Sequence, residues 1–249
     1  MPRAERAPWP AAAAGALLVL GLCACGAQPP LPSPAGEAAP PAGLEYAPPA
    51  PGTYELPPIA PAVDGDVLDA SGTRHRLFDY MGDRHVLLSF VYLHCRDARG
   101  CPLATANFHL IRQDIEADPE LAQNVRLVTL SFDPERDTPA ALREHGLPDG
   151  GSATAGGGTW SVLTTESRAA IEPILDGFGQ TVVREIDETG KQTGDFSHVL
   201  KVFLVDRQHR VRNIYSSSYL HPAIALNDVR TLLLEEKNAA PVRNARQDR

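Results

Sequence analysis

The sequence predicts an α/β domain in which a parallel strand–helix–strand unit is followed by two antiparallel strands and a final helix. An apolar strand, Val86–Tyr92, leads into a helix that begins at Pro102, and a second apolar strand, Val125–Phe132, follows it. Strands joined by a connection of this length form a right-handed βαβ unit. A tight turn then joins two further strands, Leu200–Val205 and Val211–Tyr215, ahead of the last amphipathic segment.

The first 24 residues resemble a secretory signal. An apolar run, Ala11–Leu22, follows two arginines and is shorter than the ~20 residues that span a bilayer. It ends in a small residue before Cys25, as in a bacterial lipobox. We therefore expect residues 1–24 to be removed and Cys25 to be lipidated, with Cys23 as a poorer site. An ordinary secretory signal or an uncleaved anchor is the alternative.

Residues 25–61 are dense in proline and alanine and show no periodic apolar face. Such a segment favours an extended tether with polyproline II character. A disordered tail without a role is the alternative. We expect the folded domain at 62–236 and a polar tail at 237–249.

The domain is predicted to open with a β-hairpin over Val67–Thr73 that turns at Ser71–Gly72. Val86–Tyr92 is apolar on both faces, as is typical of a central strand covered on both sides. The helix from Pro102 to Ala117 begins with a proline, which suits the first helical position. Its predicted buried face is Leu103, Leu110, Ile111 and Ile115.

The later elements are a short helix, a glycine-rich surface loop, a strand and two helices. In order they are Pro139–His145, Gly146–Gly158, Trp160–Leu163, Glu166–Phe178 (with Pro173 as a kink or a shifted start) and Pro222–Leu234. This order is the thioredoxin arrangement, here with an N-terminal β-hairpin extension. In that arrangement reactive cysteines lie between the first core strand and the next helix.

Cys95 and Cys101 occupy this position, and they are the two thiols that remain if Cys25 is lipidated. An oxidising exported compartment would allow a disulfide between them. Six positions along a helix rise about 9 Å, whereas a disulfide needs α-carbons about 4.4–6.8 Å apart. We therefore assign only Cys101 to the helix, with Gly100 giving the loop freedom to bend back.

The helix start is expected to lower the pKa of Cys101, helped by Arg96 and Arg99 and opposed by Asp97. Two thiolates suit a soft metal ion, Cu(I) first, although Zn²⁺ also accepts them. Among the eight histidines, His198 is the candidate third ligand because it precedes the strand that borders the cysteine loop. A packed or solvated His198 is the alternative.

Two other histidines lie near the cysteines in the sequence. His94 adjoins Cys95, but neighbouring residues of an extended chain point apart. His109 falls off the apolar face of its helix and is expected to be solvated.

These pieces resemble the Sco/SenC family over about Pro61 to Glu235. The matching stretches are Phe90–Cys95 (FVYLHC), Cys101–Leu103 (CPL), Ser131–Pro139 (SFDPERDTP), Trp160–Thr164 (WSVLT), and Ser197–His198 ahead of Phe203–Asp206 (FLVD). The resemblance implies a thioredoxin-like copper protein that assists assembly of the CuA centre of cytochrome c oxidase. It also implies Cu(I) or Cu(II) ligation by Cys95, Cys101 and His198.

One departure from the family concerns the cysteine loop, which is two residues longer than the usual C-x-x-x-C-P. The longer loop could weaken copper binding, favour thiol–disulfide exchange or suit another client. Asp133 and Asp137 lie within the SFDPERDTP stretch. They are expected either to support the metal site or a partner contact, or to stabilise a turn and the start of a helix.

The first functional hypothesis is an exported lipoprotein that is anchored to a membrane. It would receive copper or electrons from periplasmic copper or thiol donors and would deliver copper to an oxidase subunit. The alternative is a thiol–disulfide reductase that keeps client cysteines reduced. A peroxidase is a third, disfavoured because Thr105 and Arg96 do not form the required pattern. The net charge of −8 argues against a nucleic-acid partner.

Overall fold

The computed structural model describes residues 40–145 and 158–247, with side chains to residue 239. The predicted signal, Cys25, the first part of the tether and most of the glycine-rich loop lie outside these residues. None of the described helices combines the length and apolar character that a membrane span requires.

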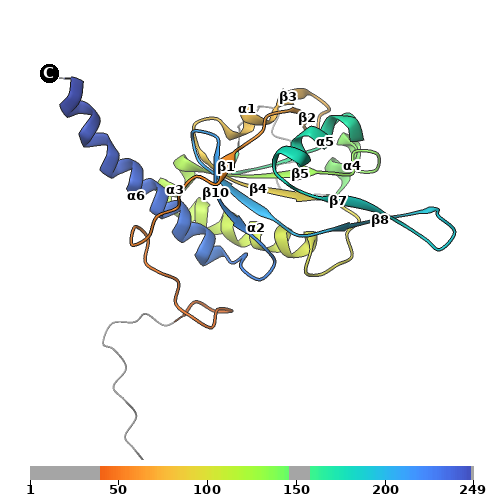
Figure 1. Cartoon of the computed structure of the whole chain (residues 1–249), viewed down its shortest axis with the longest axis horizontal. Helices are drawn as coiled ribbons and strands as arrows, with labels where there is room; N and C mark the ends of the chain where they lie inside the picture. Colours follow the sequence, from red (N-terminus) through yellow and green to blue (C-terminus); the bar gives the residue numbers. More distant parts are fainter. Residues whose placement is uncertain (1–39, 146–157, 248–249) are drawn as a thin grey trace, which may run out of the picture. The chain divides into compact units, whose positions relative to one another are not determined.

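A six-stranded mixed sheet forms the centre, in the order β1-β10-β9-β4-β5-β6 (Figure 1). Its strands are β1 (Ala60–Pro61), β4 (His85–Val91), β5 (Val125–Ser131), β6 (Trp160–Leu163), β9 (Val202–Val205) and β10 (Arg210–Tyr215). Every residue of β4 is buried, as expected for a central strand. β4 pairs in parallel with β5 and antiparallel with β9, which confirms the predicted α/β, thioredoxin-like order.

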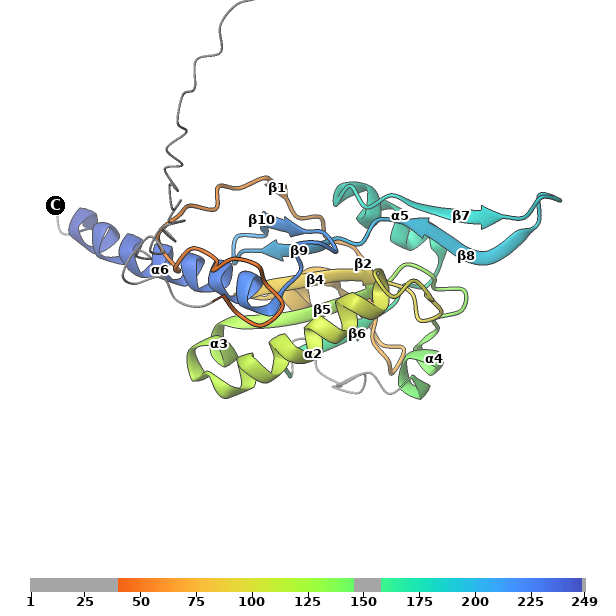
Figure 2. The same cartoon turned by 90° about the horizontal axis from the view of Figure 1, so that it is seen from below.

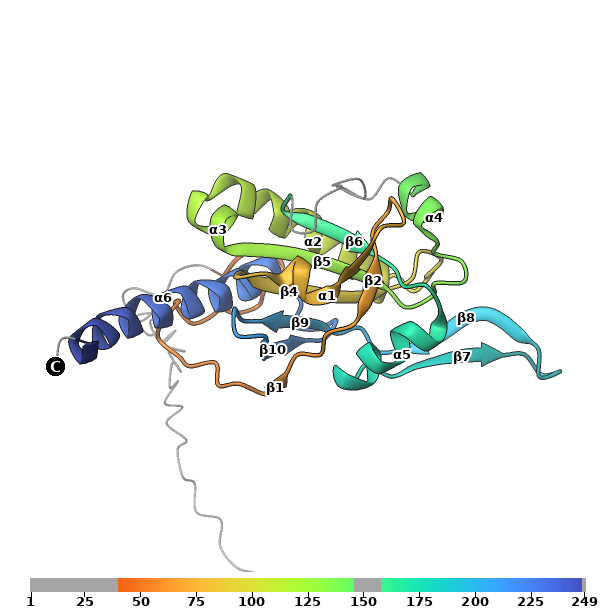
Figure 3. The same cartoon turned by 90° about the horizontal axis from the view of Figure 1, so that it is seen from above.

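Helices cover both faces of this sheet. They are α1 (Leu77–Met81), α2 (Cys101–Ala117), α3 (Pro119–Asn124), α4 (Pro139–Glu144), α5 (Arg168–Gly177) and α6 (Pro222–Gln247). The helices α2 and α6 lie on one face, whereas α1 and α5 lie on the other (Figures 2 and 3). The predicted hairpin is β2 (Asp66–Leu68) and β3 (Arg74–Arg76), with Gly72 in its turn at φ +87°.

Several local expectations need correction. Leu110 was predicted on the buried face of α2 but is 51% exposed, because the buried face runs through Ala104, Phe108, Ile111 and Ile115 and Leu110 lies to one side of it. α5 begins at Arg168, where the Ser167 hydroxyl caps the Ala170 N–H, and Pro173 stays inside the helix. The helices α1 and α3, each too short to show a period, were not predicted.

A second antiparallel hairpin, β7 (Val182–Ile186) and β8 (Gln192–His198), projects beyond the central sheet (Figure 1). Sequence periodicity did not indicate it, because many of its side chains are exposed on both faces. The hairpin matters for function, since β8 ends at His198.

The proline-rich segment contacts the domain from about residue 42. The Ala42 carbonyl lies 3.0 Å from His221 Nε2, and the Tyr54 hydroxyl donates to Asp228 at 2.6 Å. The sequence had placed the start of the folded domain near Ala62. At the other end, α6 continues to Gln247, beyond its predicted end at Leu234.

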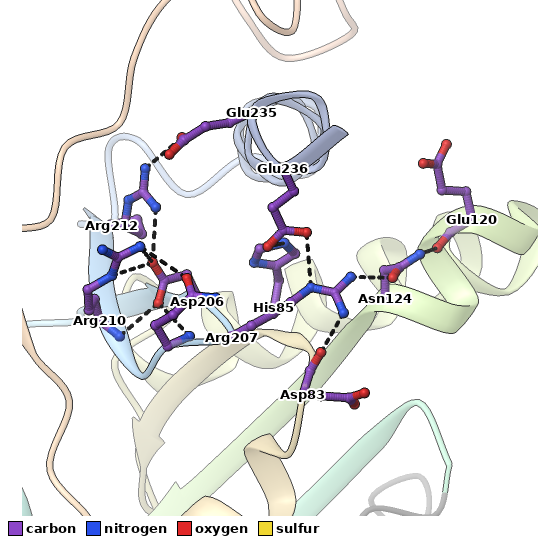
Figure 4. Close-up of polar contacts among 11 residues, drawn as sticks. Asp83, His85, Glu120, Asn124, Asp206, Arg207, Arg210, Arg212, Glu235 and Glu236 are labelled. Carbon is purple, nitrogen blue, oxygen red and sulfur yellow. Dashed lines mark hydrogen bonds and ion pairs between the residues drawn. The ribbon is translucent and has the colours of Figure 1, made fainter. Parts of the chain in front are cut away.

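A charged network anchors α6 to the end of the sheet (Figure 4). Asp206, 1% exposed, accepts hydrogen bonds from Arg210 Nε at 2.8 Å and Arg212 Nη1 at 2.9 Å. Arg212 also pairs with Glu235 of α6 at 2.7 Å. Burial would raise the pKa of Asp206, but these arginines outweigh it and hold the pKa below its ordinary value.

We predict that Asp206→Asn lowers the free energy of unfolding by about 3 kcal/mol at pH 7, because it removes the buried one of the two carboxylates that pair with Arg212. Since the folded-state pKa of Asp206 is lowered, its contribution is complete above about pH 4 and is lost as the pH falls through the folded value. Urea unfolding at pH 7 and in acid measures this. The exposed Asp114→Asn is the matched control, and equal stability of the two variants at pH 7 would contradict the prediction.

Candidate metal centre

The cysteine loop begins where β4 leaves the sheet, and a buried carboxylate holds it there. Asp137 Oδ2 accepts the Leu93 N–H at 2.9 Å and the Ser131 hydroxyl at 2.6 Å. Burial raises the pKa of Asp137, against the opposing effect of these hydrogen bonds. Asp137 therefore supports the loop directly, whereas Asp133 forms an ion pair with Arg136.

The loop folds into a compact turn over Asp97. The Asp97 carbonyl accepts the Gly100 N–H at 2.9 Å, and its carboxylate accepts the Arg99 N–H at 3.0 Å. A β-carbon at Gly100 would lie 3.4 Å from Cys95 Sγ and 3.3 Å from the Asp97 carbonyl oxygen. Glycine at this position thus allows Cys95 to bend back toward the helix, as the spacing predicted.

Cys101 is the first residue of α2 and is 4% exposed, whereas Cys95 is only partly buried. Both are free thiols. Burial raises the pKa of Cys101 well above the ordinary thiol value, and the nearby Cys95 adds to this effect. The expectation of a lowered pKa was wrong, because the cost of burying a thiolate exceeds the help of the helix start.

His198 completes a group of three candidate ligands. Its Nε2 lies 3.5 Å from Cys101 Sγ, and its Nδ1 lies 3.4 Å from the Phe196 carbonyl. The Sγ atoms of Cys95 and Cys101 and a ring nitrogen of His198 all lie within 4.8 Å of one another. Donors bound to one ion at about 2.0–2.3 Å are separated by roughly 3.5–3.8 Å, so a small contraction would close them around a metal.

Burial lowers the pKa of His198 and favours the neutral imidazole, which is the form that binds metal ions. The ring packs edge-on against Tyr92, with centroids 5.8 Å apart, and against Phe132 at 5.1 Å. Phe196 packs on the same two rings. This aromatic wall fixes the position of the imidazole.

The remaining nearby histidines stay outside the cluster. The His94 side chain is 58% exposed and its Nδ1 lies 3.6 Å from Asp137 Oδ1. His109 is exposed and packs edge-on against Trp160 at 5.0 Å. Within the described ranges, Cys95, Cys101 and His198 are the one group of this kind.

Sequence reasoning missed how His198 reaches the site. The β7–β8 hairpin delivers it, with Val182 opposite His198 in the ladder. The signal that could have found the hairpin is the turn at Asp187–Gly190, where the Asp187 carboxylate accepts the Thr189 and Lys191 N–H groups and Gly190 has φ +83°. Asp-x-x-Gly between two polar strands is a hairpin turn.

We predict unequal thiol reactivity in the reduced, metal-free protein. At pH 8 the Cys101→Ser variant, which keeps the accessible Cys95, should react with iodoacetamide at least tenfold faster than Cys95→Ser, because burial restricts access to Cys101 and raises its pKa. Mass spectrometry of timed samples measures both rates. Faster alkylation of Cys95→Ser would contradict the assigned burial, and full alkylation of both variants in urea serves as the control.

Several solved structures are similar to this protein. The copper-bound ScoI of Bradyrhizobium japonicum is 21% identical, with a TM-score of 0.52 over 68% of this chain and 98% of that chain. The apo Sco1 protein of Thermus thermophilus is 24% identical, with a TM-score of 0.54 over 73% of this chain and 95% of that chain. These identities are low, so the likeness establishes the shared thioredoxin-like fold.

A further similar structure is a SCO1/SenC family lipoprotein of Bacillus anthracis, 22% identical, with a TM-score of 0.52 over 68% of this chain and 93% of that chain. No curated protein matches the chain. A family model described as SCO1/SenC matches residues 66–234, more than half of the sequence and all of the site. The chain therefore belongs to the SCO1/SenC family.

Proposed function

We propose that this protein is a membrane-tethered copper chaperone. In this proposal Cys95, Cys101 and His198 hold copper and pass it to a respiratory oxidase with a CuA-type site. The observation that carries the proposal is the convergence of two sulfur atoms and one imidazole nitrogen within 4.8 Å. Membership of a family whose solved members include copper-bound ScoI and yeast Sco1 supports it.

The donor set suits copper in either oxidation state. Two soft sulfur ligands favour Cu(I), and the neutral imidazole of His198 also suits Cu(II). Cys95 is the more exposed sulfur. An incoming client thiolate would therefore meet the copper from the Cys95 side and exchange with that ligand first, while Cys101 and His198 still hold the ion.

The N-terminal sequence supports a location on the outer side of a membrane. A lipid on Cys25 and an extended segment after it would hold the domain on the outer side of a membrane, within reach of an oxidase subunit. The B. anthracis relative named as a lipoprotein supports this arrangement. Within the described residues, the proline-rich segment already contacts the domain at Ala42, whose carbonyl lies 3.0 Å from His221 Nε2.

Copper titration of the reduced protein tests the proposal. We expect about one Cu(I) per chain, and at least tenfold weaker affinity in His198→Ala, measured by competition with a chromogenic Cu(I) chelator. His109→Ala is the matched control, because His109 is exposed and outside the cluster. A stoichiometry far below one, or an unchanged affinity in His198→Ala, would refute the proposed copper site.

One observation favours thiol–disulfide exchange as a second candidate function. An accessible Cys95 lies beside a buried Cys101, which is the arrangement of an attacking and a resolving cysteine. The Cys95 thiolate would attack a client disulfide and release one client thiol. Cys101 would then displace the second, leaving Cys95 and Cys101 oxidised and the client reduced.

The histidine separates the two functions, because exchange needs only the cysteines. We predict that His198→Ala keeps its rate of reducing a peptide disulfide within about threefold of wild type, while its copper affinity falls. Quenched-flow trapping of the peptide thiols measures the rate, and Cys95→Ser is the inactive control. Absence of exchange in the wild-type protein would rule out the reductase.

A further inference from the structure

The arginines of this protein divide into two groups. Within residues 40–145 and 158–239, all but two arginine side chains donate a hydrogen bond or form an ion pair. The paired ones are Arg74, Arg76, Arg84, Arg112, Arg126, Arg136, Arg143, Arg168, Arg184, Arg207, Arg210, Arg212 and Arg230. The two without a partner in this described part are Arg96 and Arg99, and both lie in the loop between the cysteines.

Both unpaired arginines are exposed, on a loop whose backbone is held in place. Hydrogen bonds to Asp97 and the buried Gly100 fix the turn between them. Asp97 is the acidic residue of this loop, and its carboxylate is already engaged by the Arg99 N–H at 3.0 Å. Within the described part of the chain, neither guanidinium group is engaged, so both are exposed to an approaching partner.

The surroundings have the composition of a docking surface. Val199, directly after His198, is 65% exposed, so an exposed apolar residue follows one candidate ligand in the sequence and two exposed cations lie between the other two. Interfaces combine an apolar centre with a polar rim, and arginine is enriched in them. A guanidinium group donates two parallel hydrogen bonds to a carboxylate, so the chemistry that fits is an acidic side chain.

We propose that Arg96 and Arg99 form a docking site for acidic side chains of the protein that exchanges copper or thiols with Cys95. The inference rests on the proposed function and names the kind of surface that the client or donor presents. In a chain with a net charge of −8, a local pair of cations orients a negatively charged partner toward the sulfurs. Two cations are fewer than the clusters of 4–8 that hold proteins on anionic lipid.

The test measures the rate at which a partner peptide reacts with Cys95 in the absence of copper. Reduced protein carrying Cys101→Ser is mixed with a peptide whose single cysteine is capped as a thiopyridyl disulfide. The Cys95 thiolate attacks the peptide sulfur, a mixed disulfide forms, and thiopyridone leaves with the electron pair of the broken bond and is read by its absorbance. Two peptides are compared, identical except for glutamates or glutamines beside the cysteine.

We expect the acidic peptide to react about two- to thirtyfold faster than the neutral one at low salt, the range that two exposed ion pairs supply. The preference should vanish in Arg96→Gln/Arg99→Gln and shrink at high salt. Arg96→Lys/Arg99→Lys should restore part of it. Because the result is a ratio of two peptides, any change in the intrinsic reactivity of Cys95 cancels.

The matched control is Arg230→Gln/Lys237→Gln, which changes the net charge equally on α6. Arg230 pairs with Asp118 at the far end of the 17-residue α2, about 25 Å from the loop by the rise of that helix. This control should keep the wild-type preference. Equal rates for the two peptides in the wild-type background, or the same preference in every variant, would overturn the proposal.

Two further measurements separate this inference from the copper site. Copper affinity of Arg96→Gln/Arg99→Gln in the protein with both cysteines should match wild type, and a loss of affinity would place the arginines in the metal centre instead. Sedimentation with phosphatidylserine vesicles should show no binding that depends on these arginines; if it does, the partner is a membrane and the proposal fails. If the wild-type protein does not bind copper, the proposed chaperone function is refuted. The peptide rates would still test whether Arg96 and Arg99 attract acidic side chains.

Discussion

The antiparallel pairing of β4 with β9 is the constraint on which the site depends. It sets Ser89 opposite Val202, so the end of β4 lies beside the start of β9. The chain leaves the sheet at one of these points and enters it at the other. Cys95 lies just after the first point and His198 just before the second, although they are far apart in the sequence. Both strands are buried, so the hydrophobic core holds the register.

Burial also decides the chemistry of the three candidate ligands. A helix start and two nearby arginines would promote the thiolate of Cys101, but the residue is only 4% exposed and burial raises its pKa. Burial also lowers the pKa of His198 and so favours its neutral form. A bound cation would reverse the balance for Cys101, because it stabilises the thiolate at the place where the protein alone does not. The site is thus better suited to holding a metal ion than to holding a free thiolate.

The surroundings of the site divide between rigid and exposed parts. Asp137 and the aromatic wall of Tyr92, Phe132 and Phe196 fix the loop start and the imidazole. Cys95 is partly exposed, and Arg96 and Arg99 are exposed. Under the proposed function, the fixed groups would hold copper in a defined geometry, and the exposed sulfur would let another protein reach it.

The sequence by itself determined the elements with strong periodicity and the residues with distinctive chemistry. The buried strands β4 and β5, the helix α2 and the pair of cysteines all follow from apolar patterns and spacing that are local to the chain. The position of His198 just before the strand Leu200–Val205 made it a candidate ligand, and the family resemblance strengthened that assignment. Only the tertiary structure decided the exposed hairpin that delivers His198, the raised pKa of Cys101 and the exposure of Arg96 and Arg99 without a partner among the described residues. These depend on burial and on contacts between distant segments, which a local pattern does not encode.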